Sequence, residues 1–136
     1  MGLSPLVPAQ DRGQRDPVGT YSELTSGLRE PTRALRRAAP AAWAGFGDLH
    51  DAALGDGALP ARVKELMALV VSVVMQCDGC IAYHAKAAAI RGASPEEVAE
   101  ALSVAVLMGG GPATTYGSRA WAAFQEFRSS DAGTAS

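Results

Sequence analysis

The 136-residue chain is organised around the stretch Gln76-Cys77-Asp78-Gly79-Cys80-Ile81-Ala82-Tyr83-His84, which holds both of its cysteines and one of its two histidines. The alanine-rich residues 85–92 that follow predict a helix ending at a glycine. If Cys80 and His84 lie on that helix, they are four residues apart and face the same side. An imidazole then lies within reach of one thiol, with Cys77 one turn earlier. Thiol–disulfide chemistry uses this set of groups.

Whole-chain properties narrow the class of protein. A length of 136 residues predicts one domain, and a formal net charge of −2 excludes a strongly basic nucleic-acid-binding surface. Residues 1–20 carry prolines and charges where a signal peptide has an apolar core, and the apolar run Leu66 to Met75 is too short to span a bilayer. We therefore expect a soluble cytoplasmic protein with no nucleic-acid or membrane partner. In a reducing compartment a close cysteine pair is redox-active or binds metal.

The first part of the chain predicts an arm followed by short helices. Residues 1–20 are expected to form a mobile N-terminal arm. Tyr21 to Arg29 predicts a short helix, and Glu30-Pro31 is expected to open the next, from Thr32 to Ala39. This second segment carries a basic cluster that favours a solvated helix face over an anion site: Arg33, Arg36 and Arg37.

Two further helices are predicted before the cysteine stretch. Pro40 can occupy a first helical turn, and an apolar stripe follows at three-residue spacing, made of Trp43, Phe46 and Leu49. His50 on this helix is expected to be packed or hydrogen-bonded rather than catalytic. The next helix starts at Leu59-Pro60 and runs to about Met75. Its end is apolar nearly all round, which predicts a central buried helix. Spacing alone makes Glu65 a surface residue near the helix start.

The C-terminal part also predicts helices. Ser94-Pro95-Glu96-Glu97 has the pattern of a capping box with proline at the first helical position. Gly109-Gly110-Gly111-Pro112 favours a turn between helices over a phosphate-binding nest, because no strand precedes it and no Walker lysine follows. The last helix is expected from Ala113 to Phe127, and residues 129–136 should fray. Without period-two alternation, the sequence predicts an all-α domain over residues 21–128, with six or seven helices.

The cysteine pair leaves several hypotheses open. The positive end of the helix favours a thiolate on Cys77, whereas the imidazole of His84 favours one on Cys80. A base acts directly on the thiol that it touches, so we expect Cys80 to attack and Cys77 to resolve the oxidised sulfur. Zinc is an alternative if His50 or Glu65 supplies a fourth ligand. Two buried structural cysteines beside a core histidine are the third possibility.

One further spacing carries a family resemblance. Glu65 is followed after eleven residues by Cys77-x-x-Cys80 and, three residues later, by His84. This pattern resembles the motif of the AhpD-like alkylhydroperoxidases of the carboxymuconolactone decarboxylase superfamily. The glycine turn at 109–113 after an apolar helix is also similar to that family, and the resemblance covers residues 60–127, about half of the chain.

The resemblance implies a helical bundle that assembles into trimers or hexamers. It also implies antioxidant peroxide reduction without a cofactor or metal, through a proton relay from Glu65 through His84 to Cys80. A lipoyl-bearing protein or another dithiol donor would re-reduce the disulfide. The decarboxylase branch lacks the cysteine pair, so decarboxylation is not expected. A non-enzymatic redox-sensing or metal-binding oligomer is the alternative.

The chain departs from this family between its cysteines. Characterised members carry a histidine there, whereas this chain has Asp78-Gly79. A carboxylate beside Cys77 should disfavour its thiolate.

Overall fold

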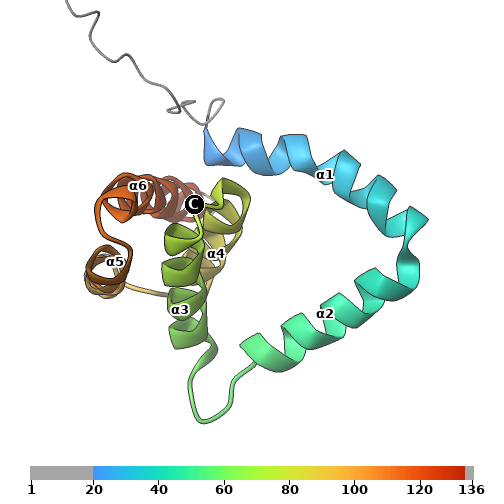
Figure 1. Ribbon diagram of the computed structural model, residues 1–136, viewed down its shortest axis with the longest axis horizontal. Helices are drawn as coiled ribbons and strands as arrows, with labels where there is room; N and C mark the ends of the chain where they lie inside the picture. Colours follow the sequence, from blue (N-terminus) through green and yellow to red (C-terminus); the bar gives the residue numbers. More distant parts are fainter. Residues whose placement is uncertain (1–19, 134–136) are drawn as a thin grey trace, which may run out of the picture.

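The computed structural model describes residues 20–133 and shows an all-α chain of six helices in this range, which confirms the predicted fold class (Figure 1). The predicted mobile arm, apart from Thr20, lies outside the described residues, as do 134–136 of the predicted frayed tail. None of the helices in residues 20–133 is long and apolar enough to cross a membrane. The helices are α1 (Tyr21–Ala38), α2 (Pro40–Leu54), α3 (Ala61–Val74), α4 (Asp78–Ile90), α5 (Pro95–Gly109) and α6 (Gly111–Ala132).

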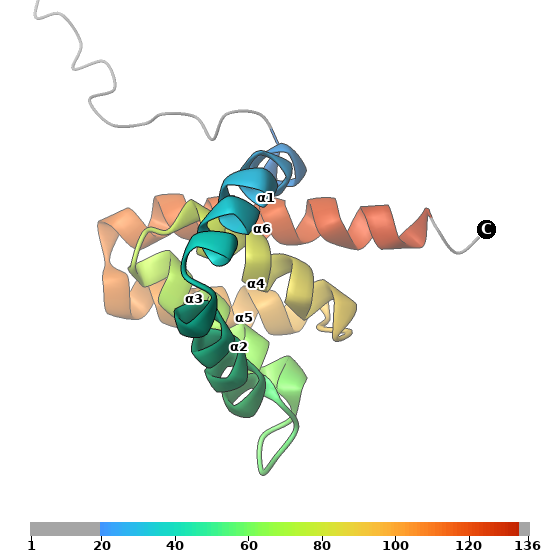
Figure 2. The ribbon, with the colours of Figure 1, turned by 90° about the vertical axis from the view of Figure 1, so that its right-hand side faces the viewer.

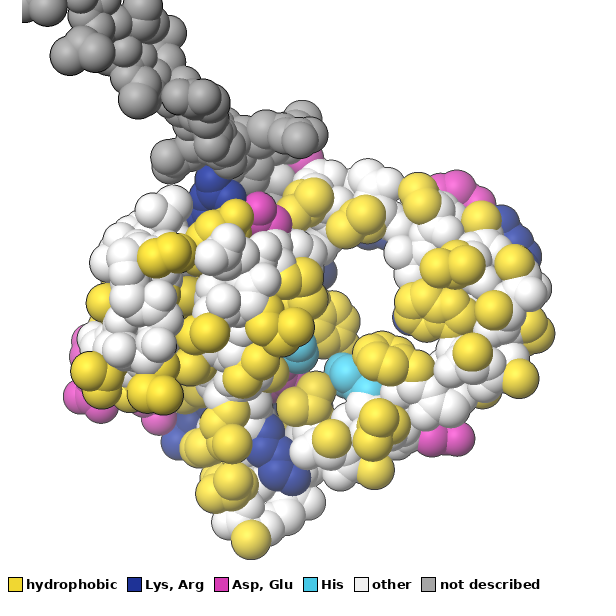
Figure 3. Space-filling model, viewed as in Figure 1, with side chains coloured by type: hydrophobic (Ala, Val, Ile, Leu, Met, Phe, Trp, Pro, Cys, Tyr) yellow, Lys and Arg dark blue, Asp and Glu magenta, His cyan; other side chains and the backbone are white. Residues whose placement is uncertain are grey.

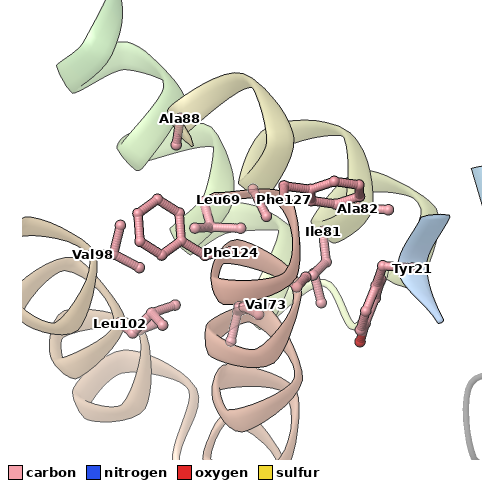
Figure 4. Close-up of a cluster of buried hydrophobic side chains, with 14 of the residues drawn as sticks. Tyr21, Leu69, Val73, Ile81, Ala82, Ala88, Val98, Leu102, Phe124 and Phe127 are labelled. Atoms are coloured by element: carbon pink, nitrogen blue, oxygen red, sulfur yellow. The ribbon is translucent and has the colours of Figure 1, made fainter. Parts of the chain in front are cut away.

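Helices α3 to α6 pack into a bundle. Helices α1 and α2 lie along one side of it and meet at an angle at Ala39 (Figures 1 and 2). The bundle core is built from small and branched apolar residues around one aromatic ring. Phe124 of α6 is fully buried and lies between Val98 of α5 and Leu69 of α3 (Figure 4). The small residues of α4, Ala82, Ala85 and Ala88, allow close packing against α3 and α6.

Helix α1 corrects the prediction of two short helices. It runs without a break through Pro31 and begins at a capping box formed by Thr20 and Glu23. Pro31 cannot donate the backbone hydrogen bond to the carbonyl of Gly27, four residues earlier. Because Gly27 is exposed, that carbonyl can bond to water, which lets the helix continue.

The start of α1 is fastened to α6. Glu126 accepts hydrogen bonds from the backbone N–H groups of Tyr21 (3.1 Å) and Ser22 (2.9 Å). These are N–H groups that no residue within the helix can pair, and a carboxylate at this end of a helix is electrostatically favourable. Tyr21 itself is buried against the bundle. Helix α1 is therefore anchored at its first turn, next to the start of α4.

Helix α3 is central but buried on one side only, which corrects the prediction of a helix covered all round. It packs against α4, α5 and α6 through Ala61, Glu65, Leu69, Ser72 and Val73. Leu66 and Val70 are partly buried against the core, whereas Met67, Val71, Val74 and the following Met75 are exposed. The apolar stripe of α2 is likewise uncovered at Phe46 and Leu49. A single chain of this size leaves these faces in contact with solvent.

The turn from α3 into α4 has the same hydrogen bonds as the turn that ends α4. After α3, the N–H of Gln76 donates to Val73 and that of Cys77 to Ser72; after α4, Gly92 and Ala93 donate to Ala89 and Ala88. Both pairs form a Schellman motif, in which one residue adopts a left-handed conformation. Gly92 does so at φ 79°, as the sequence predicted for a helix ending at glycine, but Gln76 does so at φ 56°.

The end of the chain follows the predicted signals closely, with one difference. The capping box of Ser94 and Glu97 is confirmed. Gly110 alone separates α5 from α6, with φ 67° and ψ −147°, so the glycine segment is a turn between helices as predicted. Helix α6 continues to Ala132, beyond the predicted end at Phe127. Residues 129–132 are therefore helical.

We predict that Gln76→Gly raises the free energy of unfolding by about 1 kcal/mol, because glycine adopts the left-handed conformation without steric strain. Gly92→Gln places a side chain in the same conformation at the matching turn and should lower stability by a similar amount. Urea unfolding of the two variants and the unchanged chain measures both effects. A loss of stability in Gln76→Gly would show that the Gln76 side chain itself holds the turn.

Candidate active site

Both cysteines lie at the start of α4 and are joined by a disulfide, Cys77–Cys80, with their Cα atoms 5.2 Å apart. Cys77 is the N-cap residue of α4, and its sulfur accepts a hydrogen bond from the backbone N–H of Cys80 (3.2 Å). The Schellman turn after α3 places Cys77 at this position, since its own N–H is bonded to Ser72. The pair is therefore held where helix N–H groups stabilise negative charge on sulfur.

Glu65 and His84 meet between α3 and α4. The Nδ1 atom of His84 lies 2.8 Å from Oε2 of Glu65, and the glutamate side chain is only 4% exposed. A buried carboxylate needs such a partner, and it can only accept hydrogen bonds when ionised. Nδ1 then carries the proton, which leaves Nε2 of His84 free to accept one. This corrects the interpretation from spacing alone, which placed Glu65 on the surface.

A cavity of about 740 Å³ lies between α4 and the pair of helices α1 and α2, and its wall includes Cys80 and His84. Both histidines of the chain lie beside this hollow in Figure 3. Helix α4 contributes Gly79, Cys80, Tyr83 and His84. Helices α1 and α2 contribute Arg36, Pro40, Trp43, Ala44, Phe46, Gly47, His50 and Asp51. Because aromatic and aliphatic groups form much of the wall on the side of α1 and α2, the cavity suits a small molecule with an apolar part.

The two cysteines differ in access. Cys80 is exposed and lines the cavity, whereas Cys77 is half-buried and lies outside the lining residues. A substrate in the cavity would meet the sulfur of Cys80 first. This arrangement favours the predicted order, in which Cys80 attacks and Cys77 resolves.

Asp78, the residue that departs from the family pattern, has two partners from distant parts of the chain. Its carboxylate lies 3.2 Å from Nη1 of Arg119 on α6 and accepts a hydrogen bond from the hydroxyl of Tyr21 on α1 (3.2 Å). Burial, followed by the nearby Asp78 charge, raises the pKa of Tyr21 above its ordinary value, so Tyr21 stays a donor. The Arg119 charge offsets that of Asp78, which weakens the predicted penalty on the Cys77 thiolate.

A second hydrogen-bonded group lines the same cavity. Tyr83 Oη lies 3.1 Å from Nε2 of His50, and Nδ1 of His50 lies 3.2 Å from Oδ1 of Asp51. The prediction that His50 is hydrogen-bonded is confirmed, but the residue also faces the cavity of Cys80. Sequence reasoning gave Tyr83 no role. Its only signal was its position three residues after Cys80, which puts it on the same helical face.

The basic cluster of α1 divides between solvent and cavity. Arg37 forms an exposed ion pair with Glu30 (3.0 Å), as a solvated face would. Arg36 instead places its guanidinium over the ring of Trp43, 5.0 Å from the ring centroid, and lines the cavity. This contact is a cation–π interaction, which also fixes one end of the cavity wall.

The described residues offer little support for a metal site. Within residues 20–133, no group of three or more His, Cys, Asp or Glu side chains is arranged to hold a metal ion. Glu65 and His84 bond to each other, and His50 bonds to Tyr83.

Comparison with known proteins assigns the family. The model of the carboxymuconolactone decarboxylase family matches residues 38–123, a range that includes Glu65, both cysteines and His84. An uncharacterized protein from Cupriavidus necator is 42% identical over 106 residues, which cover 76% of this chain and 94% of that protein. The chain belongs to the carboxymuconolactone decarboxylase family, which confirms the resemblance to AhpD-like proteins.

Solved structures agree with this assignment. A crystal structure of an apo carboxymuconolactone decarboxylase family protein from Legionella pneumophila is similar at a TM-score of 0.78 and 39% identity, covering 79% of this chain and 96% of that one. A family member from Thermotoga maritima, for which involvement in an antioxidative response has been suggested, gives a TM-score of 0.72 and 32% identity. That match covers 84% of this chain and 97% of the other.

We predict that Glu65→Gln keeps the fold but lowers the reactivity of Cys80 about 10- to 100-fold, the range for groups that orient functional imidazoles. A neutral amide stabilises the imidazolium of His84 less, and this imidazolium in turn stabilises the thiolate less. Alkylation of the reduced protein by iodoacetamide should therefore shift to higher pH. Glu100→Gln, at an exposed position of α5, is the control. Identical profiles for both variants would remove Glu65 from the relay.

Proposed function

We propose that this protein is a thiol-dependent peroxidase that reduces organic hydroperoxides through Cys80 and Cys77. One observation carries the proposal: the exposed cysteine of the pair shares a cavity wall with an imidazole that a buried carboxylate orients. A site of this kind can activate a thiol and then protect the oxidised sulfur as a disulfide. The suggested antioxidative involvement of the Thermotoga maritima relative points in the same direction.

In the first step, Nε2 of His84 takes the proton of the Cys80 thiol, and Glu65 stabilises the resulting imidazolium. The thiolate attacks the terminal oxygen of the hydroperoxide. A sulfur–oxygen bond forms and the oxygen–oxygen bond breaks, so that Cys80 is oxidised to a sulfenic acid and the peroxide is reduced to an alcohol once its leaving oxygen gains a proton. The apolar wall of the cavity supports an organic substituent on the peroxide.

In the second step, the thiol of Cys77 attacks the sulfur of Cys80. A disulfide forms and the sulfenic oxygen leaves as water after taking up a proton. A dithiol donor, such as a lipoyl-bearing protein, then reduces the disulfide and becomes a disulfide itself. The exposure of Cys80 gives such a donor a sulfur to attack.

The alternative function uses the same residues without turnover. A redox-sensing protein would form the Cys77–Cys80 disulfide once per oxidation event and pass the change to a partner. Multiple turnovers of hydroperoxide with a dithiol present separate the enzyme from the sensor.

We predict that the unchanged protein consumes an organic hydroperoxide catalytically with dihydrolipoamide as donor, and that Cys80→Ser abolishes this activity. Cys77→Ser should undergo one oxidation that stops at a sulfenic acid on Cys80, because the resolving thiol is missing. Mass spectrometry after one equivalent of peroxide identifies the product. A reactive Cys80→Ser protein with a sulfenic acid on Cys77 would reverse the assignment, and single turnover in the unchanged protein would favour the sensor.

We further propose that the chain works as a homotrimer or homohexamer. Large apolar side chains remain exposed along α3 and α5, namely Met67, Val71, Met75, Val104, Leu107 and Met108. Soluble single chains seldom expose this much apolar surface without a binding role.

Light scattering at micromolar concentration is expected to give a mass three or six times the 14.0 kDa of one chain. The midpoint of thermal unfolding should rise with protein concentration, because dissociation is then linked to unfolding. A mass close to that of one chain at every concentration would contradict the proposal.

A further inference from the structure

The cavity of Cys80 contains a second titratable set that the relay of Glu65 and His84 does not use. Asp51, His50 and Tyr83 form a chain of hydrogen bonds that ends at the tyrosine hydroxyl. All three line the cavity together with Cys80. The order of carboxylate, imidazole and hydroxyl is suited to supplying a proton at the end of the chain.

The geometry of α4 brings the two sets to one reacting atom. Tyr83 and His84 follow Cys80 by three and four residues, so both lie on its side of the helix, one turn further along. Their rings meet edge to face with centroids 5.1 Å apart, and the ring of His50 meets Tyr83 at 5.6 Å. A molecule at the Cys80 sulfur would therefore have His84 and the Tyr83 hydroxyl around it.

Peroxide reduction requires an acid as well as a base. Attack of the thiolate expels an alkoxide, which is a strong base, about as basic as hydroxide. Protonation of that oxygen as the oxygen–oxygen bond breaks lowers the barrier, and a positioned acid contributes roughly 10²- to 10⁴-fold. In the relay proposed above, His84 serves the thiolate as its base and is held in place by its contact with buried Glu65.

We propose that Tyr83 is the catalytic acid of the peroxidase proposed above and that His50 supplies its proton. The Tyr83 hydroxyl gives its proton to the leaving alkoxide, which becomes an alcohol. The phenolic oxygen takes a proton from Nε2 of a His50 imidazolium, which becomes a neutral imidazole with its remaining proton on Nδ1, facing Asp51. The sulfur of Cys80 loses two electrons to the peroxide, and the tyrosine is unchanged at the end of the step.

A route for returning a proton to His50 is present in a second hollow beside His50 and Tyr83. This hollow of about 400 Å³ is open to solvent, and its charged and polar lining residues are His50, Asp51, Glu65, Tyr83 and Arg91. Asp51 is a positioning residue here: its side chain is 86% exposed, and its carboxylate holds the ring of His50 through the 3.2 Å contact with Nδ1. Water in this hollow can reprotonate His50 after each turnover.

The leaving group provides the test. Reduced protein is mixed with tert-butyl hydroperoxide, which expels an alkoxide, or with peracetic acid, which expels a carboxylate whose acid has a pKa near 4 and needs no proton donor. Thiol loss in a single turnover is followed by alkylation and mass spectrometry. Tyr83→Phe should slow the hydroperoxide reaction about 100-fold while changing the peracid reaction little, and His50→Gln should act in the same direction.

Two controls separate a proton donor from a structural residue. Tyr83 is 51% exposed, so removal of its hydroxyl leaves the packing of α4 intact, which circular dichroism verifies. Tyr116→Phe removes a hydroxyl on α6 that does not line the cavity and should leave both reactions unchanged.

The outcomes are distinct. Equal slowing of both oxidants, or no slowing in Tyr83→Phe, would overturn the role of Tyr83 while leaving the proposed peroxidase in place. Failure of the unchanged protein to react with the hydroperoxide would remove the proposed function, and this inference with it.

Discussion

The buried pair of Glu65 and His84 constrains the rest of this structure. A carboxylate that is almost wholly withdrawn from water is stable only if a hydrogen-bonded partner accompanies it, and that partner must come from another helix. The pair therefore fixes how α3 lies against α4. The short turn at Gln76 has to reverse the chain within a few residues, even at the cost of a left-handed glutamine, for the two side chains to meet.

Local signals in the sequence predicted most of the helices, and a four-residue spacing placed Cys80 and His84 on one helical face. The capping box at Ser94 and the helix end at Gly92 depend on neighbouring residues only, so they can be read directly. The positions of Cys80 and His84 follow from the helical period. The burial of Glu65 does not follow from its own surroundings; only the family resemblance raised it above a surface residue.

The features that the sequence could not show depend on contacts between distant segments or on the surroundings of a residue. Pro31 looked like a helix start because a proline removes one hydrogen bond, but an exposed turn tolerates that loss. The ion pair of Asp78 with Arg119 joins residues 41 positions apart, so sequence could not show that the carboxylate beside Cys77 is compensated. Helix α3 looked fully buried because composition records hydrophobicity, whereas burial depends on how many neighbours the chain can provide.

The two imidazoles of the cavity differ in their electrostatic surroundings, and that difference suits them to opposite tasks. Glu65 is buried, so little water screens its contact with Nδ1 of His84, and the ring of His84 is held firmly in place. Asp51 is exposed, so water screens its contact with Nδ1 of His50 and has access to that pair. In the proposed step the base and the acid are separate groups. Helix α4 places them side by side as His84 and Tyr83, each bonded to a different partner helix.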